Sequence, residues 1–185
     1  MMVTTHAAIG LLLALPLVAV APELAAVGAL AAVAGGVFPD LDLLVGVHRR
    51  TLHFPAYYWL PALSASALAL ARPGPATVAV ALFFLSAAVH SVSDAFGGGP
   101  ELRPWEATSD EGVYLHPKDR WIPPKRWIRY DGAPEDLLLA AALSIPALFA
   151  FDGVVRSIVV VGLVISAAYA AVRKRIPEEL LERFQ

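Results

Sequence analysis

Histidine and aspartate residues gather at one end of the apolar segments that flank them, and they include four of the five histidines. The set consists of His6, Asp40, Asp42, His48, His53, His90 and Asp94. Imidazole nitrogens and carboxylate oxygens bind divalent metal ions, and they are costly at a lipid-facing surface when unpaired. Because the chain has no cysteine, thiolate ligands are excluded. The pattern predicts a metal site built from His and Asp in a membrane protein.

Two short motifs supply four of the predicted ligands. His90 and Asp94 are four residues apart, so on a helix they project from one face and can bind the same ion or neighbouring ions. In the segment 38–42 (FPDLD) the proline ends a helix, and an extended backbone would point Asp40 and Asp42 the same way. A polar turn is the alternative, but hydrophobic residues on both sides make simple solvation less convincing.

The segment 48–53 (HRRTLH) contains two histidines and two arginines. Guanidinium groups match the oxygens of phosphate or carboxylate, so a metal beside Arg49 would suit an anionic, phosphorylated group. The alternative is that Arg49 and Arg50 only anchor the inner end of a helix. We predict His53 as a metal ligand, His48 as a proton shuttle that titrates near neutral pH, and Arg49 as the group that stabilises developing negative charge.

His6 is expected to join the site from the first turn of the first helix, which Thr4 or Thr5 can cap. The predicted metal ligands are therefore His6, Asp40, Asp42, His53, His90 and Asp94. A catalytic zinc ion generally takes three protein ligands, so this larger set predicts either two ions or a supporting role for some residues. Zinc is the expected metal, and manganese or another divalent ion would also suit these donors.

Six apolar segments have the composition of helices that enter or cross a bilayer, namely 7–21, 24–38, 55–71, 75–95, 135–151 and 153–172. Proline and glycine mark their edges, as at Pro22, at Pro73 and in the run 97–100 (GGGP). Hydrophobic residues make up 58% of the chain and charged residues 16%, an apolar excess over ordinary soluble domains. These features predict one all-α domain, a polytopic membrane bundle of about six helices.

Two alternatives to this bundle are weaker. Several segments have only about 15 apolar residues, short of the roughly 20 that a perpendicular span requires. A thinned bilayer, partial insertion or extended helix ends would cover this difference. A soluble helical bundle is one alternative, but segments with so few charges leave too little polar surface for water. A cleaved signal peptide is the other, because residues 19–21 (AVA) look like a small-residue cleavage site. Residues 1–6 contain no Lys or Arg, so the basic leading region is missing.

The distribution of Lys and Arg predicts the orientation of the bundle. With the N-terminus inside and six crossings, twelve of the 14 basic residues lie on the inner side, and only Arg72 and Arg156 lie on the outer side. This bias predicts a multi-pass protein of the cell membrane with both termini cytoplasmic. The same orientation places the whole predicted site at the cytoplasmic face. The net charge of −2 gives no basic field of the kind that binds nucleic acid.

Residues 97–134 form the one long polar loop, and residues 173–185 form a short charged cytoplasmic tail. The loop, which contains the fifth histidine, His116, interleaves aromatic and basic residues, as suits the lipid headgroup layer. It is predicted either to cover the metal site as a lid or to rest on the membrane. Pro123 and Pro124 disfavour a continuous helix through it.

The order of these motifs resembles that of a known family. The series comprises Thr5-His6 with Gly10, the segment 36–42 (GVFPDLD), His48-Arg49 with His53, and His90 with Asp94. Over about the first hundred residues it is similar to the membrane-bound metal-dependent hydrolases, also called the YdjM or LexA-binding inner-membrane-associated hydrolase family. That family usually has Thr-His-Ser around the second histidine, whereas Leu52 and Phe54 flank His53 here. The resemblance implies a helical membrane protein with a zinc-type hydrolytic centre, distantly similar to zinc-dependent phospholipases C.

The leading hypothesis is an integral membrane metal-dependent hydrolase that acts on a phosphoester or lipid-like substrate at the cytoplasmic face. Bound divalent ions would activate water and polarise the phosphoryl or acyl oxygen. A structural or regulatory metal site without turnover is one alternative. A metal or proton transporter is another, disfavoured because transport needs polar groups across the bilayer, whereas these cluster at one end. Membrane lipid is the expected partner, and the oligomeric state is not predicted.

Overall fold

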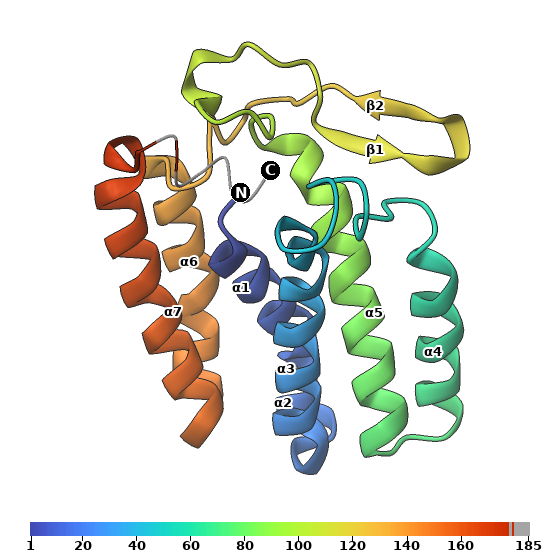
Figure 1. The fold of residues 1–185 in the computed structure, drawn as a ribbon. Helices are drawn as coiled ribbons and strands as arrows, with labels where there is room; N and C mark the ends of the chain where they lie inside the picture. Colours follow the sequence, from blue (N-terminus) through green and yellow to red (C-terminus); the bar gives the residue numbers. More distant parts are fainter. Residues whose placement is uncertain (178, 180–185) are drawn as a thin grey trace.

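The computed structural model describes residues 1–177 and 179. These residues form the helices α1 (Val3–Ala14), α2 (Pro16–Val20), α3 (Pro22–Val37), α4 (Trp59–Ala71), α5 (Pro75–Ser93), α6 (Pro134–Ala150) and α7 (Gly153–Val172). A two-stranded antiparallel sheet joins β1 (Val113–Leu115) to β2 (Arg120–Ile122). The long helices run side by side, and the sheet lies across one end of the bundle (Figure 1). The expected all-α architecture is confirmed.

Each predicted apolar segment contains a helix, and proline sets several of the boundaries. Pro22, Pro75 and Pro134 stand in the first turns of α3, α5 and α6, where the missing N–H has no intrahelical partner to lose. The first segment differs from the prediction of one continuous helix because Pro16 separates α1 from α2. The third also differs, since residues 55–58 form turns and α4 begins only at Trp59.

Among the described residues, four apolar helical segments are long enough to cross a membrane. They are Val3–Val20, Pro22–Leu43, Pro75–Phe96 and Gly153–Arg175. Helix α4 has 13 residues and α6 has 17, so α4 extends about 20 Å against a hydrocarbon thickness of about 30 Å. Large apolar side chains cover the outside of the bundle, with Leu70 86% and Phe149 84% exposed. The prediction of six crossings stays a prediction.

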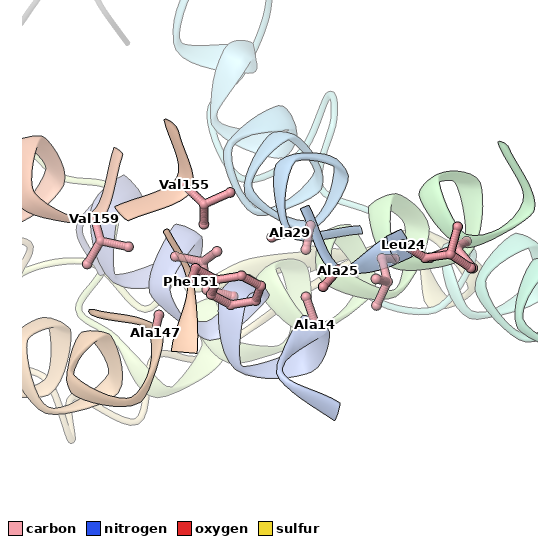
Figure 2. Packing of buried hydrophobic residues seen from close by; sticks show 12 residues of the cluster. Ala14, Leu24, Ala25, Ala29, Ala147, Phe151, Val155 and Val159 are labelled. Atoms are coloured by element: carbon pink, nitrogen blue, oxygen red, sulfur yellow. The ribbon is translucent and has the colours of Figure 1, made fainter. Parts of the chain in front are cut away.

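The main hydrophobic cluster lies at the end of the bundle away from the sheet. It joins the last turns of α1 and α6 to the first turns of α3, α5 and α7, through Leu11, Ala14, Leu24, Val78, Phe151 and Val155 among others. Figure 2 shows the ring of Phe151 in the middle of this cluster, surrounded mainly by small side chains. Close packing at this end fixes the relative positions of the helices whose opposite ends carry the predicted site.

Glycine allows α1 and α3 to approach closely along their length. A Cβ atom on Gly10 would lie 2.5 Å from the carbonyl oxygen of Ala32, and one on Gly36 would lie 2.7 Å from that of His6. Small residues permit such backbone contact between helices in an apolar bundle. As a result His6, at the start of α1, lies beside the end of α3.

The polar loop between α5 and α6 folds over the open end of the bundle (Figure 1). Arg49 ties the loop down, because its Nη1 donates to the carbonyl oxygens of Gly98 and Gly112 and its own carbonyl accepts from the N–H of Tyr114 at 3.0 Å. Within described residues 97–133 the chain forms short 3₁₀ turns and the β1–β2 hairpin but no α-helix. The disfavoured helix through Pro123 and Pro124 is thus absent from this stretch.

Candidate metal centre

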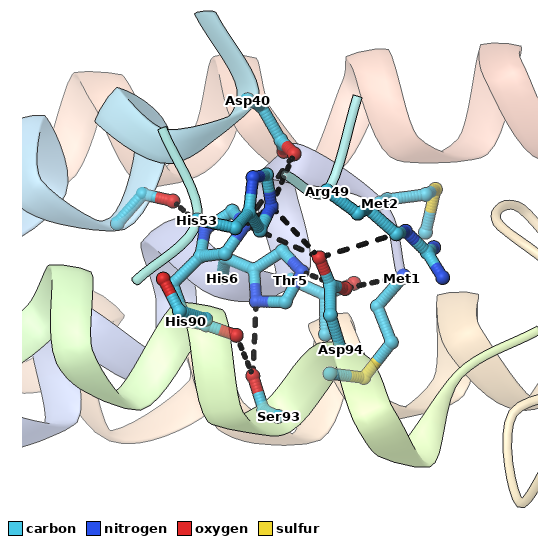
Figure 3. Close-up of polar contacts among 12 residues, drawn as sticks. Met1, Met2, Thr5, His6, Asp40, Arg49, His53, His90, Ser93 and Asp94 are labelled. Atoms are coloured by element: carbon cyan, nitrogen blue, oxygen red, sulfur yellow. Dashed lines mark hydrogen bonds and ion pairs between the residues drawn. The ribbon is translucent and has the colours of Figure 1, made fainter. Parts of the chain in front are cut away.

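Four side chains from three parts of the chain converge under the loop (Figure 3). Nε2 of His53 lies 3.1 Å from Nε2 of His90, 3.0 Å from Oδ2 of Asp94 and 3.6 Å from Oδ1 of Asp40. Nε2 of His90 lies 3.3 Å from the same Asp40 oxygen and 3.5 Å from Oδ2 of Asp94. Tetrahedral zinc, with bonds of about 2.0–2.1 Å, separates its donor atoms by about 3.3–3.4 Å. These donors therefore fit one divalent ion.

The two histidines present their Nε2 atoms because their Nδ1 atoms are already engaged. Nδ1 of His90 donates to the carbonyl oxygen of Gly36 at 2.6 Å, and Nδ1 of His53 donates to Oδ2 of Asp42 at 2.8 Å. Two Nε2 lone pairs 3.1 Å apart repel each other unless a positive charge lies between them. A hydrogen bond from Nδ1 to a carbonyl or carboxylate is the usual support of a metal-bound imidazole.

The pKa of His53 shows how strongly this site attracts positive charge. Burial by itself would lower the pKa, but hydrogen bonds to Asp40, Asp42 and Asp94 outweigh it and raise the pKa of His53 to about 10. A proton or a divalent ion can supply the charge, and metal binding displaces the proton.

Helix ends position the four donors. His90 lies in the last turns of α5 and Asp94 begins the 3₁₀ turn that continues it, so the predicted four-residue spacing brings both side chains into one donor group, with Nε2 of His90 3.5 Å from Oδ2 of Asp94. The extended backbone expected at Asp40 and Asp42 is wrong, because Phe38–Leu43 forms a 3₁₀ helix with Pro39 in its first turn. The two aspartates therefore have different roles.

Asp42 lies outside the four-donor group and contacts two histidines, His48 and His53. Its Oδ1 accepts from Nδ1 of His48 at 2.9 Å and its Oδ2 accepts from Nδ1 of His53 at 2.8 Å. Asp42, His48 and His53 form a second group whose atoms are close enough to share an ion. Because both carboxylate oxygens already hold imidazole N–H groups, the contacts favour an orienting role for Asp42.

Replacing Asp42 with Asn tests this role. We expect metal affinity to fall about 10- to 100-fold, because an amide can no longer accept hydrogen bonds from both histidines and His53 loses its fixed tautomer. Competition with a zinc-sensitive dye measures the affinity of the purified variant. The control is Asp110→Asn in the exposed part of the loop, which makes the same chemical change away from the site. Equal affinities of the two variants would assign no orienting role to Asp42.

His6 lies next to the four donors but outside their group. Its Nε2 is 3.0 Å from Oδ1 of Asp94, its Nδ1 is 3.2 Å from Oγ of Ser93, and its ring stacks on His90 with centroids 3.6 Å apart. His6 thus contacts the Asp94 oxygen that faces away from His53. That His6 is itself a metal ligand stays a prediction.

The sequence reasoning missed two residues that hold these groups in place. Ser93 joins His6 to the carbonyl oxygen of His90, and the buried Asp136 accepts from Oγ1 of Thr5 and from the N–H of Met2, each at 2.7 Å. Asp136 thereby fixes the start of α1 to the start of α6. Acidic residues are common in the first turn of a helix, so the position of Asp136 carries no sequence signal of this contact.

Arg49 and His48 lie at the edge of the four-donor group. Arg49 has a left-handed backbone (φ 62°), and its Nε lies 3.7 Å from Oδ2 of Asp94 with no hydrogen-bond partner among the described residues. For His48, burial lowers the pKa more than the hydrogen bond to Asp42 raises it. Both residues, together with Asp40, line a cavity of about 560 Å³. The predicted catalytic pair therefore faces a space large enough for a substrate.

His116 lies apart from the metal centre. Its ring contacts those of Phe54, Tyr57 and Tyr114, with a centroid distance of 4.7 Å to Phe54.

Searches against protein-family models, curated proteins and solved structures found no match for the chain. Its function has to be inferred from the chemistry of the site.

Proposed function

We propose that the chain is an integral membrane metal-dependent hydrolase that acts on a phosphoester or lipid-like substrate at the cytoplasmic face. We further propose that it belongs with the membrane-bound metal-dependent hydrolases whose motif order it resembles. The observation that carries the proposal is the spacing of the Asp40, His53, His90 and Asp94 donors, 3.0–3.6 Å for the five measured pairs, beside a cavity lined by Arg49.

The placement of charge supports a membrane orientation with the site inside. The loop over the site and the segment around Arg49 lie at one end of the bundle (Figure 1), whereas Arg72 follows α4 and Arg156 lies in the first turn of α7, at the other end. The four membrane-length helices run between these ends. A positive-inside distribution then puts the site, and both termini, on the cytoplasmic side.

Each residue near the cavity has a defined part in the proposed reaction. A divalent ion, when bound, supplies Lewis acidity that activates water and polarises a phosphoryl oxygen. Arg49 stabilises negative charge on the substrate through its Nε, which has no hydrogen-bond partner within the described part of the chain. His48, whose Nδ1 donates to Oδ1 of Asp42 at 2.9 Å, would use its Nε2 for proton transfer to or from water and the leaving group.

The cavity favours an enzyme over a purely structural metal site. Four protein donors would also suit a structural zinc ion, which is enclosed by its ligands, so an enzyme requires one position of the ion to stay open to water or substrate. The side chain of Asp40 is 12% exposed and lines the cavity, while His53 and His90 are fully buried. Transport is disfavoured by the apolar cluster that packs the opposite end of the bundle.

The test is metal analysis combined with turnover in maltoside micelles. We expect about one equivalent of zinc or manganese by mass spectrometry, and hydrolysis of bis(p-nitrophenyl) phosphate or p-nitrophenyl phosphate that a chelator abolishes and added metal restores. A protein that binds metal but hydrolyses neither these nor p-nitrophenyl acetate would have a structural site. A protein that binds no metal would contradict the proposal altogether.

A further inference from the structure

We propose that the cavity beside the metal centre and an apolar groove continuous with it form one binding site for a phosphorylated lipid. The phosphate would lie between Arg49 and Arg173, and one hydrocarbon chain would lie in the groove between α1, α3 and α7. This inference deepens the proposed function and rests on it for the identity of the reacting group. It adds α7 to a site whose sequence motifs all precede residue 95.

Two buried arginines wall the polar end of the cavity. Arg173, at the end of α7, pairs with both oxygens of Asp131 through Nε at 2.8 Å and Nη2 at 3.1 Å. Its Nη1 is buried and, like Nε of Arg49, has no hydrogen-bond partner among the described residues. Side chains of both arginines are only 5% exposed. Buried guanidinium N–H groups without acceptors are costly, and phosphate oxygens would satisfy them.

One acidic residue adds an acceptor to these donors. Glu101 lines the same cavity, and its Oε2 is buried without a hydrogen-bond partner among the described residues. A carboxylate oxygen in this position can accept from a hydroxyl group of a lipid headgroup. Donors for phosphate and an acceptor for a hydroxyl at one end of the cavity would together bind a polar lipid headgroup. Apolar residues, including Leu43, Ile165 and Ile176, also line the cavity.

A second, apolar space of about 340 Å³ adjoins this cavity. The two spaces share Val3, Thr4, Ile165 and Ser166 as wall residues. The lining of the second space adds Ala7, Leu11, Val33, Val37, Val159 and Gly162, which belong to α1, α3 and α7. We call this second space the groove. Its walls come mainly from α1, α3 and α7, which belong to three of the segments long enough to cross a membrane.

The few hydroxyls that line the groove do not make it polar. Oγ of Ser166 donates to Oγ1 of Thr4 at 2.7 Å and is also 2.8 Å from the carbonyl oxygen of Gly162. Thr4 and Ser166 thus satisfy one another, and Oγ of Ser157 donates to the carbonyl oxygen of Gly153 at 3.2 Å. With Ser144 as the remaining hydroxyl residue of the lining, the groove offers mainly apolar surface to an occupant. A small water-soluble phosphoester would leave the groove empty, whereas a lipid chain would fill it from the bilayer.

Gly162 gives a direct way to block the groove. A Cβ atom there would meet nothing closer than Cγ2 of Thr4 at 4.0 Å, so a larger side chain can be added without a clash at its base. Leucine is also a better helix former than glycine. Gly162→Leu should therefore fold as α7 while its side chain occupies the chain-binding space. The control is Val160→Leu, on the exposed side of the same helix and outside both cavities.

The probe is hexadecyl phosphate with a diazirine in the middle of its chain, photo-crosslinked to the full-length protein in maltoside micelles. We expect mass spectrometry to find the labels concentrated on groove residues of α1, α3 and α7. Gly162→Leu should reduce this labelling about tenfold, and Val160→Leu should leave it unchanged. The diazirine analogue of hexadecanol should not label the groove, because it lacks the phosphate that Arg49 and Arg173 bind.

Two further comparisons make the result decisive. Arg173→Gln should weaken groove labelling about tenfold relative to Arg175→Gln, whose arginine is exposed. Labels spread evenly over the lipid-facing surface, including α4, or equal labelling by the phosphate and the alcohol, would overturn the inference. Crosslinking requires no turnover, so a specific pattern without hydrolysis would preserve the lipid site and reject the hydrolase. Hydrolysis together with labels spread over the lipid-facing surface would preserve the hydrolase and reject the lipid site.

Discussion

Asp94→Asn is expected to remove the bound metal and to lower phosphoester hydrolysis by about 10³-fold or more, the loss that several kcal/mol of metal-ion catalysis represents. Oδ2 of Asp94 lies 3.0 Å from Nε2 of His53 in the donor group, and Oδ1 lies 3.0 Å from Nε2 of His6. An amide offers one oxygen and no negative charge, so it cannot bind the ion and His6 together. Metal content and turnover of the purified variant measure the effect.

The same prediction has a readout that does not depend on activity. A ligand that binds only the folded state raises its stability, so added zinc should raise the melting temperature of the unmodified protein. Asp94→Asn should lose this zinc-dependent increase, whereas Asp110→Asn, in the exposed loop, should retain it. If Asp94→Asn does not fold, His90→Asn removes the Nε2 donor while its amide N–H can still donate to the carbonyl oxygen of Gly36, as Nδ1 of His90 does. Normal zinc stabilisation in both ligand variants would exclude these residues from a metal site.

The parts of the site that could be predicted are those set by local periodicity. The four-residue spacing of His90 and Asp94 places both on one helix face, whatever packs against it. Proline marked the starts of α3 and α5, and Pro39 and the run 97–100 marked where these segments end, which placed Asp40 and His90 at the same end of the bundle. These rules need only neighbouring residues, and the structure agrees with them.

The parts that could not be predicted depend on contacts between distant segments. Asp40 and Asp42 have different partners because the backbone between them is a 3₁₀ helix, which the alternating acidic pattern does not reveal. Arg173 lies in a basic run that resembles an ordinary stop at the membrane surface, yet it is buried and contacts Asp131. Burial of that kind follows from how α7 packs against the loop, and residue spacing holds no information on it.

Substitution of Arg49 is expected to lower catalysis without loss of bound metal. Arg49→Lys should retain bound metal but lower kcat for a phosphoester about 10²- to 10³-fold, as expected when a preorganised donor to the transition state is lost. Lysine keeps the positive charge beside Asp94, which is 3.7 Å from Nε of Arg49, but it lacks the planar fork that matches phosphate oxygens. Steady-state kinetics and metal analysis on the same sample test this separation.

A structural role for Arg49 gives a different result, because its side chain also holds the loop through Gly98 and Gly112. If anchoring the loop were its only contribution, Arg49→Lys would lower the melting temperature, and added guanidinium would not restore turnover. We expect guanidinium at millimolar concentration to restore part of kcat in Arg49→Ala, since the added ion can occupy the vacated space and bind the substrate phosphate. Arg50→Lys is the matched control, because Arg50 is exposed and lies over the ring of Tyr114. Equal kinetics for Arg49→Lys and Arg50→Lys would remove Arg49 from the proposed mechanism.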